Sequence, residues 1–172
     1  MKICVNAGHF VGVDSGAVGQ KGTQEACVNK IIAIQVVEKL KSKGHNVILV
    51  TDKSLSNVVK ASNDFGADYF VSIHCNSATN KQARGTETFY WKGNAKGKKL
   101  AKAINDEIVS TLSTRDRGIK ENTTFYVVKY TKCPAVLVEC EFISNLEGEK
   151  LLIEKMSVFA EAITKGILKG IS

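Results

Sequence analysis

The chain has 172 residues, the size of a single domain that can bury a substantial core. Its composition, 44% hydrophobic and 24% charged, is that of an ordinary soluble globular protein and excludes a disordered chain. The net charge of +7 favours an anionic partner, such as nucleic acid, anionic lipid or a cell-wall polymer, although solvated lysines explain the same charge.

The N-terminus and the cysteines indicate where the protein is made. Met1 leads straight into a predicted strand without a signal peptide, and no apolar run is long enough to span a membrane. The chain contains five cysteines and no Cys-x-x-Cys pair, which predicts reduced thiols and no thiolate zinc cluster. We therefore expect synthesis in the cytoplasm, and action outside the cell requires a separate route of release.

Strands and helices alternate along the chain. Short apolar runs rich in β-branched residues predict strands at 3–5, 46–51, 68–74, 85–91, 124–129 and 135–139. Amphipathic segments predict helices at 24–43, 54–65 and 98–113, with one or two more within 146–171. This order predicts an α/β fold of three layers (αβα), with a mostly parallel six-stranded sheet and helices on both faces. We expect one domain over residues 1–172.

Ionisable residues follow three of the predicted strands. His9 comes after the first strand, His74 closes the third, and Glu139 ends the last. In open parallel sheets the active site lies off the carboxyl ends of the strands. Glu25, in the first helical turn, can point its carboxylate at the same edge. His9, Glu25 and His74 could then hold zinc with an open position, and Glu139 could act as the base.

Each of these residues also has a simpler explanation when it is taken alone. A histidine at a strand end is usually only hydrogen-bonded, and a glutamate in a first helical turn usually interacts with the helix dipole. Glu139 could instead pair with Arg117. His45 lies at a predicted turn and is expected on the surface. The glycine-rich segment 12–22 matches neither the Walker phosphate-binding loop nor the dinucleotide-binding fingerprint.

Neighbouring residues offer two rival chemistries. Cys75 next to His74 suggests a Cys-His nucleophilic site, and Cys140 lies next to Glu139 in the same way. Successive strand residues face opposite sides of a sheet, which argues against both pairs. Glu141 could point the same way as Glu139 and is therefore a rival base or a second, perturbing acid.

Several motifs occur together and in order, and they cover nearly the whole chain. They are Asn-Ala-Gly-His at 6–9, Asp-Ser-Gly-Ala at 14–17 with Gly19, Glu25 with Asn29, Phe-Val-Ser-Ile-His-Cys-Asn at 70–76, Gly-Thr-Glu at 85–87, Arg-Gly-Ile-Lys at 117–120, and 134–145. In this combination the chain resembles the zinc-dependent N-acetylmuramoyl-L-alanine amidases of the His-Glu-His type (type 3), found in autolysins, sporulation amidases and phage endolysins.

The resemblance implies a fold with a six-stranded, mostly parallel sheet and a specific reaction. One zinc ion would be held by His9, Glu25 and His74, with Glu139 as the catalytic carboxylate. The substrate would be peptidoglycan, cleaved at the amide between N-acetylmuramic acid and L-alanine. We add three substrate-binding candidates from the same motifs: Asn76, Arg117 and Glu141.

The chain departs from the family at three points. Glu141 stands where the family usually has Gly or Ala, and Asn6-Ala7 replaces an Asp-Pro pair before Gly8-His9. An arginine that commonly precedes the third strand is missing, with Lys60 as the nearest cation.

Other functions remain as alternatives. A zinc carboxypeptidase-like peptidase uses similar ligands, and a non-catalytic wall-binding module would keep the fold. No nucleic-acid-binding motif is present, so no nucleic-acid partner is expected. The lysines of segment 92–102 suggest binding to anionic wall polymers, or a solvated helix face. We expect action on the wall after release or in the sporulating mother cell; the sequence carries no signal for an oligomeric state.

Overall fold

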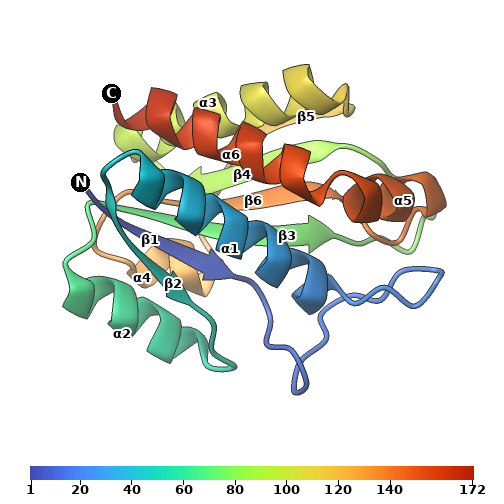
Figure 1. Cartoon of the computed structure of the whole chain (residues 1–172), viewed down its shortest axis with the longest axis horizontal. Helices are drawn as coiled ribbons and strands as arrows, with labels where there is room; N and C mark the ends of the chain where they lie inside the picture. Colours follow the sequence, from blue (N-terminus) through green and yellow to red (C-terminus); the bar gives the residue numbers. More distant parts are fainter.

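A single mixed sheet forms the centre of the computed structural model, which describes residues 1–172. Its six strands lie in the order β2-β1-β3-β6-β4-β5 (Figure 1). β1, β2, β3 and β6 are mutually parallel, whereas β4 pairs antiparallel with β6 and parallel with β5. The strands are β1 (Lys2–Ala7), β2 (Asn46–Val50), β3 (Tyr69–Asn76), β4 (Thr86–Trp91), β5 (Asp116–Asn122) and β6 (Ala135–Phe142).

Helices cover both faces of this sheet, which confirms the predicted three-layer α/β fold. α1 and α6 run side by side across the front of the sheet in Figure 1, and α3 packs against α6 on the same side. α2 and α4 pack on the other face. The helices are α1 (Glu25–Ser42), α2 (Leu55–Phe65), α3 (Ala95–Leu112), α4 (Tyr126–Tyr130), α5 (Leu146–Glu154) and α6 (Met156–Ile171). No helix combines the length and apolar character that crossing a membrane requires.

The strand alternation divides the core into two layers. On β6, Val136 and Val138 belong to the larger apolar cluster beneath α1, α3 and α6. Ala135 and Leu137 belong to the smaller cluster beneath α2 and α4. Because alternate residues face opposite sides, Glu139 follows Leu137 onto the side of α2 and α4, the thinner layer. The catalytic candidate is thereby placed where few helical residues cover the sheet.

Glycines allow α3 and α6 to approach closely. A Cβ atom on Gly166 would lie 2.4 Å from the Ile104 Cα atom, and one on Gly170 would lie 2.9 Å from Leu100 Cα. Real Cβ atoms do not approach backbone this closely, so larger residues would push the helices apart. These two positions fix the packing of the layer that supports the sheet.

Two predictions in the second half of the chain were wrong. The predicted strand 124–129 overlaps the short helix α4, and β5 was not predicted as a strand. β5 is an edge strand whose residues are mostly half-exposed, with Ile119 as its only apolar side chain, so it lacks a hydrophobic alternation. The apolar run that suggested a strand instead places Val127 and Val128 of α4 in the smaller core cluster.

Candidate metal and catalytic site

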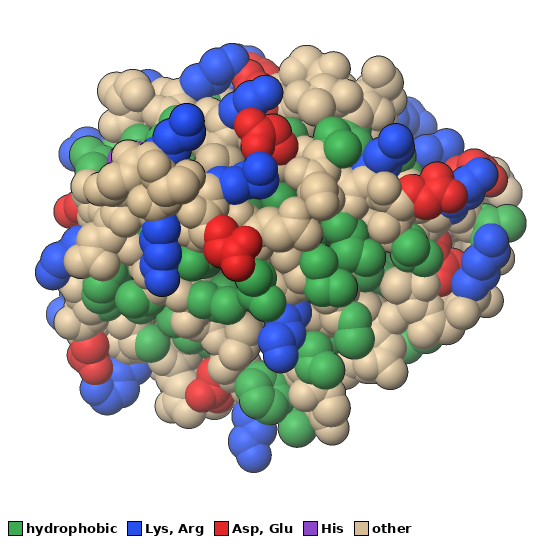
Figure 2. Space-filling model, in the orientation of Figure 1, with side chains coloured by type: hydrophobic (Ala, Val, Ile, Leu, Met, Phe, Trp, Pro, Cys, Tyr) green, Lys and Arg blue, Asp and Glu red, His purple; other side chains and the backbone are tan.

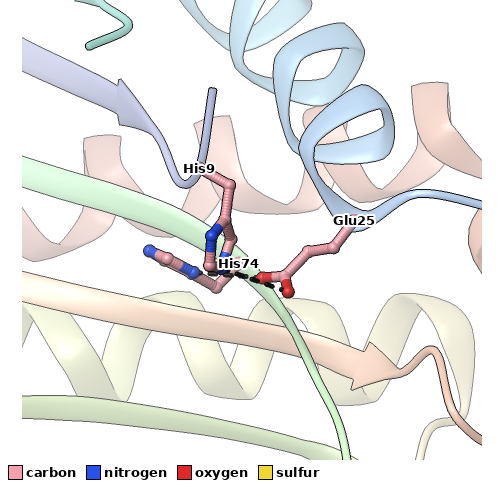
Figure 3. A group of neighbouring side chains, drawn as sticks. All are labelled: His9, Glu25 and His74. Atoms are coloured by element: carbon pink, nitrogen blue, oxygen red, sulfur yellow. Dashed lines mark hydrogen bonds and ion pairs between the residues drawn. The ribbon is translucent and has the colours of Figure 1, made fainter. Parts of the chain in front are cut away.

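The three predicted metal ligands converge at the carboxyl edge of the parallel strands. One nitrogen of each imidazole and a carboxylate oxygen of Glu25 all lie within 4.8 Å of one another. His9 Nε2 is 3.3 Å from Glu25 Oε2, and His74 Nδ1 is 3.1 Å from Glu25 Oε1. Figure 3 shows both rings pointing at the glutamate, which projects from the start of α1. Residues far apart in the sequence therefore form one cluster of nitrogen and oxygen donors.

Local backbone geometry makes this convergence possible. His9 has a φ of +63°, a left-handed conformation that side chains rarely adopt and that costs free energy. Its ring is held by Asp14, whose Oδ2 is 2.7 Å from His9 Nδ1. A Cβ on Gly8 would lie 2.1 Å from His74 Cε1, and one on Gly16 would lie 2.5 Å from His9 Cδ2. Both glycines are therefore required for the rings to sit where they do.

Glu25 is almost completely buried, and neighbouring donors hold its carboxylate. Oε1 accepts hydrogen bonds from the Cys75 backbone N at 3.1 Å and from Asn29 Nδ2 at 3.3 Å. Oε2 accepts one from the Ala17 backbone N at 2.9 Å. Burial alone would raise the pKa of Glu25, but hydrogen bonds with His74 and His9 outweigh it and hold the pKa below its usual range. The group is an anion at neutral pH.

The two histidines lie in an acidic environment. Hydrogen bonding to Glu25 raises the pKa of His9 to about 9 in the absence of a bound cation, although burial opposes this. Asp14 acts in the same direction, and its own pKa is lowered by His9. This concentration of negative charge around two imidazoles attracts a cation, either a proton or a metal ion.

Cys75 faces away from this cluster. Its buried thiol donates a hydrogen bond to Asn29 Oδ1 at 3.3 Å, and burial raises its pKa well above the usual value. Asn29 in turn donates to the Gly8 carbonyl at 3.1 Å. Cys75 and Asn29 therefore support the backbone beneath the histidines. The thiol is neutral, which argues against a Cys-His nucleophilic site.

Glu139 lies beside the metal candidates and has no charged partner. It is opposite His74 of β3 and opposite Glu87 of β4 in the sheet. Its Oε2 atom is buried and makes no hydrogen bond within the protein. Burial, followed by the negative charges of Glu25 and Glu87, raises the pKa of Glu139 well above its usual range. An unpaired buried carboxylate is costly for stability and typical of a functional site.

The suggested ion pair between Glu139 and Arg117 is not formed. Arg117 Nε donates instead to Glu87 Oε2 at 2.9 Å, and its guanidinium lies 4.8 Å from the centre of the Phe142 ring. Glu87 also accepts a hydrogen bond from Asn76 Nδ2 at 2.6 Å and pairs with the ammonium of Lys120. Burial opposes ionisation of Glu87, but Lys120 and Arg117 outweigh it and lower its pKa.

Glu87 is a residue whose role the sequence analysis missed. It joins two predicted substrate-binding residues, Asn76 and Arg117, in one charged cluster beside Glu139. Its position within an alternating strand, on the same face as Phe89, was the available signal. Arg117, the one cation considered as a partner of Glu139, instead neutralises its cross-strand neighbour Glu87, together with Lys120.

Glu141 lies apart from Glu139. The strands β3 and β6 change register between the pairs His74–Glu139 and Asn76–Phe142. Glu141 is fully buried, and its Oε1 accepts hydrogen bonds from the backbone N atoms of Gly85 and Phe142. Arg84 Nη2 is 4.0 Å from its Oε2. These contacts give Glu141 a role in holding the start of β4, away from the two histidines.

A groove of about 460 Å³ runs from the histidines across the face of the sheet that α2 and α4 cover. His9, His74 and Glu139 lie at one side of it, and the apolar side chains of α2 and α4 form walls. Neither Glu87 nor Glu141 lines it. The groove residues are Asn6, Gly8, His9, Asp14, Asp52, Lys53, Leu55, Val58, His74, Phe125, Tyr126, Val127, Leu137 and Glu139.

His45, the third histidine, lies away from this site, at the turn that precedes β2. It is half-buried, so it is more enclosed than the predicted surface residue.

The loop before α1 is held by another residue that the sequence analysis missed, Glu149 of α5. Its carboxylate is fully buried and accepts hydrogen bonds from the backbone N atoms of Lys21 and Thr23. Burial opposes ionisation, but these hydrogen bonds, with one from the Thr23 side chain, outweigh it and lower the pKa of Glu149. Glu149 therefore fixes the segment that leads into Glu25.

We expect Glu149→Gln to reduce the free energy of unfolding by about 1–3 kcal/mol at pH 7, because buried N–H groups lose a charged acceptor. The pKa of Glu149 is lower when folded than unfolded, so its contribution is complete above an unfolded value of about 4.5 and disappears as the pH falls through the folded value. Urea unfolding at pH 7, 5 and 3 tests this. Glu147→Gln, an exposed substitution in the same helix, serves as the control and should leave the free energy of unfolding unchanged. If Glu149→Gln lowered the free energy of unfolding as much at pH 3 as at pH 7, the prediction would be contradicted.

Comparisons with known proteins identify the family to which the chain is similar. The family model described as N-acetylmuramoyl-L-alanine amidase matches residues 3–172. The chain is 38% identical to the N-acetylmuramoyl-L-alanine amidase LytC of Bacillus subtilis, over 91% of this chain and 32% of that protein. It is 32% identical to the N-acetylmuramoyl-L-alanine amidase CwlM of Bacillus licheniformis, over 100% of this chain and 68% of that one. It thus spans about a third of LytC.

Solved structures give the same result. The amidase AmiC2 of Nostoc punctiforme superposes with a TM-score of 0.92 at 30% identity, covering 99% of this chain and 97% of that one. An N-acetylmuramoyl-L-alanine amidase of Clostridium difficile 630 superposes with a TM-score of 0.88 at 32% identity, covering 99% and 96%. The match extends over the whole sheet and all the elements that carry the site, and on this evidence the chain belongs to the N-acetylmuramoyl-L-alanine amidase family.

Proposed function

We propose that this protein hydrolyses the amide bond between N-acetylmuramic acid and L-alanine in peptidoglycan, using one zinc ion held by His9, Glu25 and His74. One observation carries the proposal: a His-Glu-His cluster adjoins an unpaired carboxylate, Glu139, at the side of an open groove. Family membership supplies the substrate and the scissile bond.

The residues of the cluster fit a zinc ion. Two imidazoles and one carboxylate are ligands that zinc accepts, and three protein ligands leave a coordination position for substrate or water, as in catalytic zinc sites. Asp14 contacts the far nitrogen of His9, the arrangement that commonly orients a metal-binding imidazole. When bound, zinc would polarise the substrate carbonyl and acidify water.

Glu139 is the proposed proton carrier. It takes a proton from the attacking water and later delivers it to the departing amine of L-alanine. Its raised pKa suits both steps, because a carboxylate with an ordinary pKa is a weak base and is rarely protonated near neutral pH. The neighbouring Glu87 keeps its own charge through Arg117 and Lys120, so only Glu139 remains free to exchange a proton.

The groove suits a substrate that joins a sugar to a peptide. Leu55 and Val58 of α2, Tyr126 of α4 and Phe125 directly before α4 line it, so apolar faces of a sugar or lactyl group can pack there. Asp52 and Lys53 supply polar groups at the same groove. We propose that this groove receives the substrate and that Asn76, Arg117 and Glu141 act indirectly, through the strand ends they hold.

We further propose a setting for this activity. The protein acts on the bacterial wall, as an endolysin after release or as a sporulation or autolytic amidase, and it binds anionic wall polymers as well as peptidoglycan. Relatives with these names include the sporulation-specific and germination-specific N-acetylmuramoyl-L-alanine amidases of Bacillus subtilis. Residues 1–172 form the catalytic domain.

Digestion of purified peptidoglycan followed by mass spectrometry tests the proposed reaction. We expect stem peptides with a new free amine on L-alanine, loss of activity with a chelator, and recovery when zinc is added back. A new amine on D-alanine or diaminopimelate would instead indicate a peptidase. Binding to walls without release of any fragment, at full zinc occupancy, would indicate a non-catalytic wall-binding module.

A further inference from the structure

Nine exposed lysines lie at the edge of the sheet opposite the catalytic site. β1, β2, β3 and β6 begin at this edge, and the antiparallel β4 and its parallel neighbour β5 end there. Both chain termini lie on this side in Figure 1. The exposed lysines at this edge, which we call the basic edge, are Lys2, Lys41, Lys43, Lys92, Lys96, Lys98, Lys99, Lys132 and Lys169.

Acidic residues at the same edge are fewer and partly neutralised. The Asp68 carboxylate accepts a hydrogen bond from the Lys2 backbone N at 2.7 Å, and Asp64 pairs with Lys60. Glu38 and Glu121 also lie near the edge, Glu107 pairs with Lys169, and the C-terminal Ser172 oxygen accepts a hydrogen bond from Lys99 at 2.5 Å. Figure 2 shows lysine and arginine side chains around the whole outline of this face, including the left margin, the side of the two termini, where some acidic side chains also lie. The basic edge therefore carries an excess of positive charge on the side of the sheet away from the acidic cluster around Glu25.

The densest part of the basic edge is the start of α3. Lys92, Lys96 and Lys98 form no ion pair with any acidic side chain. The first turn of α3 contains no acidic residue, although the positive end of a helix dipole disfavours cations and favours anions. Unpaired lysines at this position repel one another and the helix terminus, and an external anion would relieve that repulsion.

The surface beside these lysines is concave. A hollow of about 460 Å³ lies between α3 and α6, and four lysines contribute to it: Lys98, Lys99, Lys102 and Lys169. Lys102 is also paired with Asp106 at 2.7 Å, and Lys169 with Glu107, so the hollow keeps an excess of positive charge. A flexible chain could lie along the hollow and continue across the unpaired lysines at the start of α3.

We propose that the basic edge binds a linear polymer of phosphodiester-linked polyols attached to the bacterial wall. This inference rests on the proposed function, because an enzyme that cleaves peptidoglycan works among such polymers. Lysines on flexible stems suit repeated phosphates with no fixed geometry. Trp91, the aromatic residue directly before this segment, packs against the smaller core cluster, and residues 92–102 contain no aromatic side chain. The segment therefore offers no free ring on which a nucleic-acid base could stack, which favours this polymer over single-stranded nucleic acid.

The position of the edge has a mechanical consequence. A strand of six to eight residues separates it from the metal candidates by about 20 Å. The polymer therefore holds the enzyme on the wall without entering the groove, and binding and hydrolysis are separable by mutation.

Binding of purified poly(glycerol phosphate) to the full chain tests the proposal. We expect wild-type affinity to fall steeply as salt rises from about 50 to 200 mM, as it does for other polyanions. Combining Lys92→Gln, Lys96→Gln, Lys98→Gln and Lys99→Gln should weaken binding at least tenfold. The slope of log affinity against log salt should fall by about 3, at roughly 0.7 per lost contact.

A second variant with the same net charge provides the control. It combines Lys30→Gln, Lys81→Gln, Lys150→Gln and Lys155→Gln, all exposed lysines outside the basic edge. Its binding should stay within twofold of wild type. If both variants bound the polymer equally weakly, the loss of affinity would depend on net charge alone, and the proposal would be overturned. Absence of wild-type binding, or tighter binding of an oligonucleotide of equal charge, would also overturn it.

Hydrolysis of a soluble muramoyl peptide is measured in parallel and should be equal in all three proteins. Failure of that reaction in wild type would refute the proposed amidase function and leave the binding result interpretable.

Discussion

Glu139→Gln is expected to lower the turnover number on peptidoglycan by about 10³-fold, within the range that general acid–base catalysis contributes. The substitution keeps the size and polarity of the side chain but removes the atom that accepts the proton. Glu139 does not belong to the His-Glu-His cluster, so zinc content should remain at one ion per chain. Rates of amine release and metal analysis on the same preparation measure both quantities.

Two other glutamates make this experiment specific. Glu154→Gln, an exposed substitution in α5, should leave the rate unchanged. Glu141→Gln removes a buried acceptor for the Gly85 and Phe142 backbone N atoms, so it should lower stability more than turnover. If Glu139→Gln kept normal turnover while Glu141→Gln abolished it without unfolding, the base would be Glu141.

His74→Ala should abolish zinc binding and, with it, activity. Loss of one of three protein ligands leaves only His9 and Glu25 to hold the ion, and these two cannot define a catalytic zinc site. The buried Glu25 also loses its contact with His74 Nδ1, so we expect a decrease of about 1–3 kcal/mol in the free energy of unfolding. Zinc content after dialysis against a weak chelator, together with thermal unfolding monitored by circular dichroism, measures these effects.

His45→Ala is the matched control, because it removes the one histidine outside the cluster. It should retain zinc and activity. Full zinc occupancy in folded His74→Ala, or loss of zinc in His45→Ala, would show that the ion is bound elsewhere.

Much of the fold was predictable because hydrophobic patterns reflect burial directly. The runs before His74 and Glu139 are buried on both faces, so they appear in the sequence as continuous apolar strands. The alternation of strands and helices then predicted the parallel arrangement, and that arrangement predicted that His9, His74 and Glu139 meet at one edge. The same dependence on hydrophobic patterns explains the two errors. β5 was missed because an exposed edge strand needs few apolar residues, and α4 was predicted as a strand because a helix of five residues is too short to show a helical period.

The sequence by itself determined the family motifs, the class of the fold and the identity of the residues at the ends of the strands. Only the tertiary structure decided which charges pair. Glu139 was a candidate partner of Arg117 until the register of β4 against β6 placed Glu87 between them, where Arg117, Lys120 and Asn76 bind it. Ion pairs depend on distances of a few ångströms between segments remote in the chain, and cross-strand register, which fixes those distances, leaves no local pattern in the sequence.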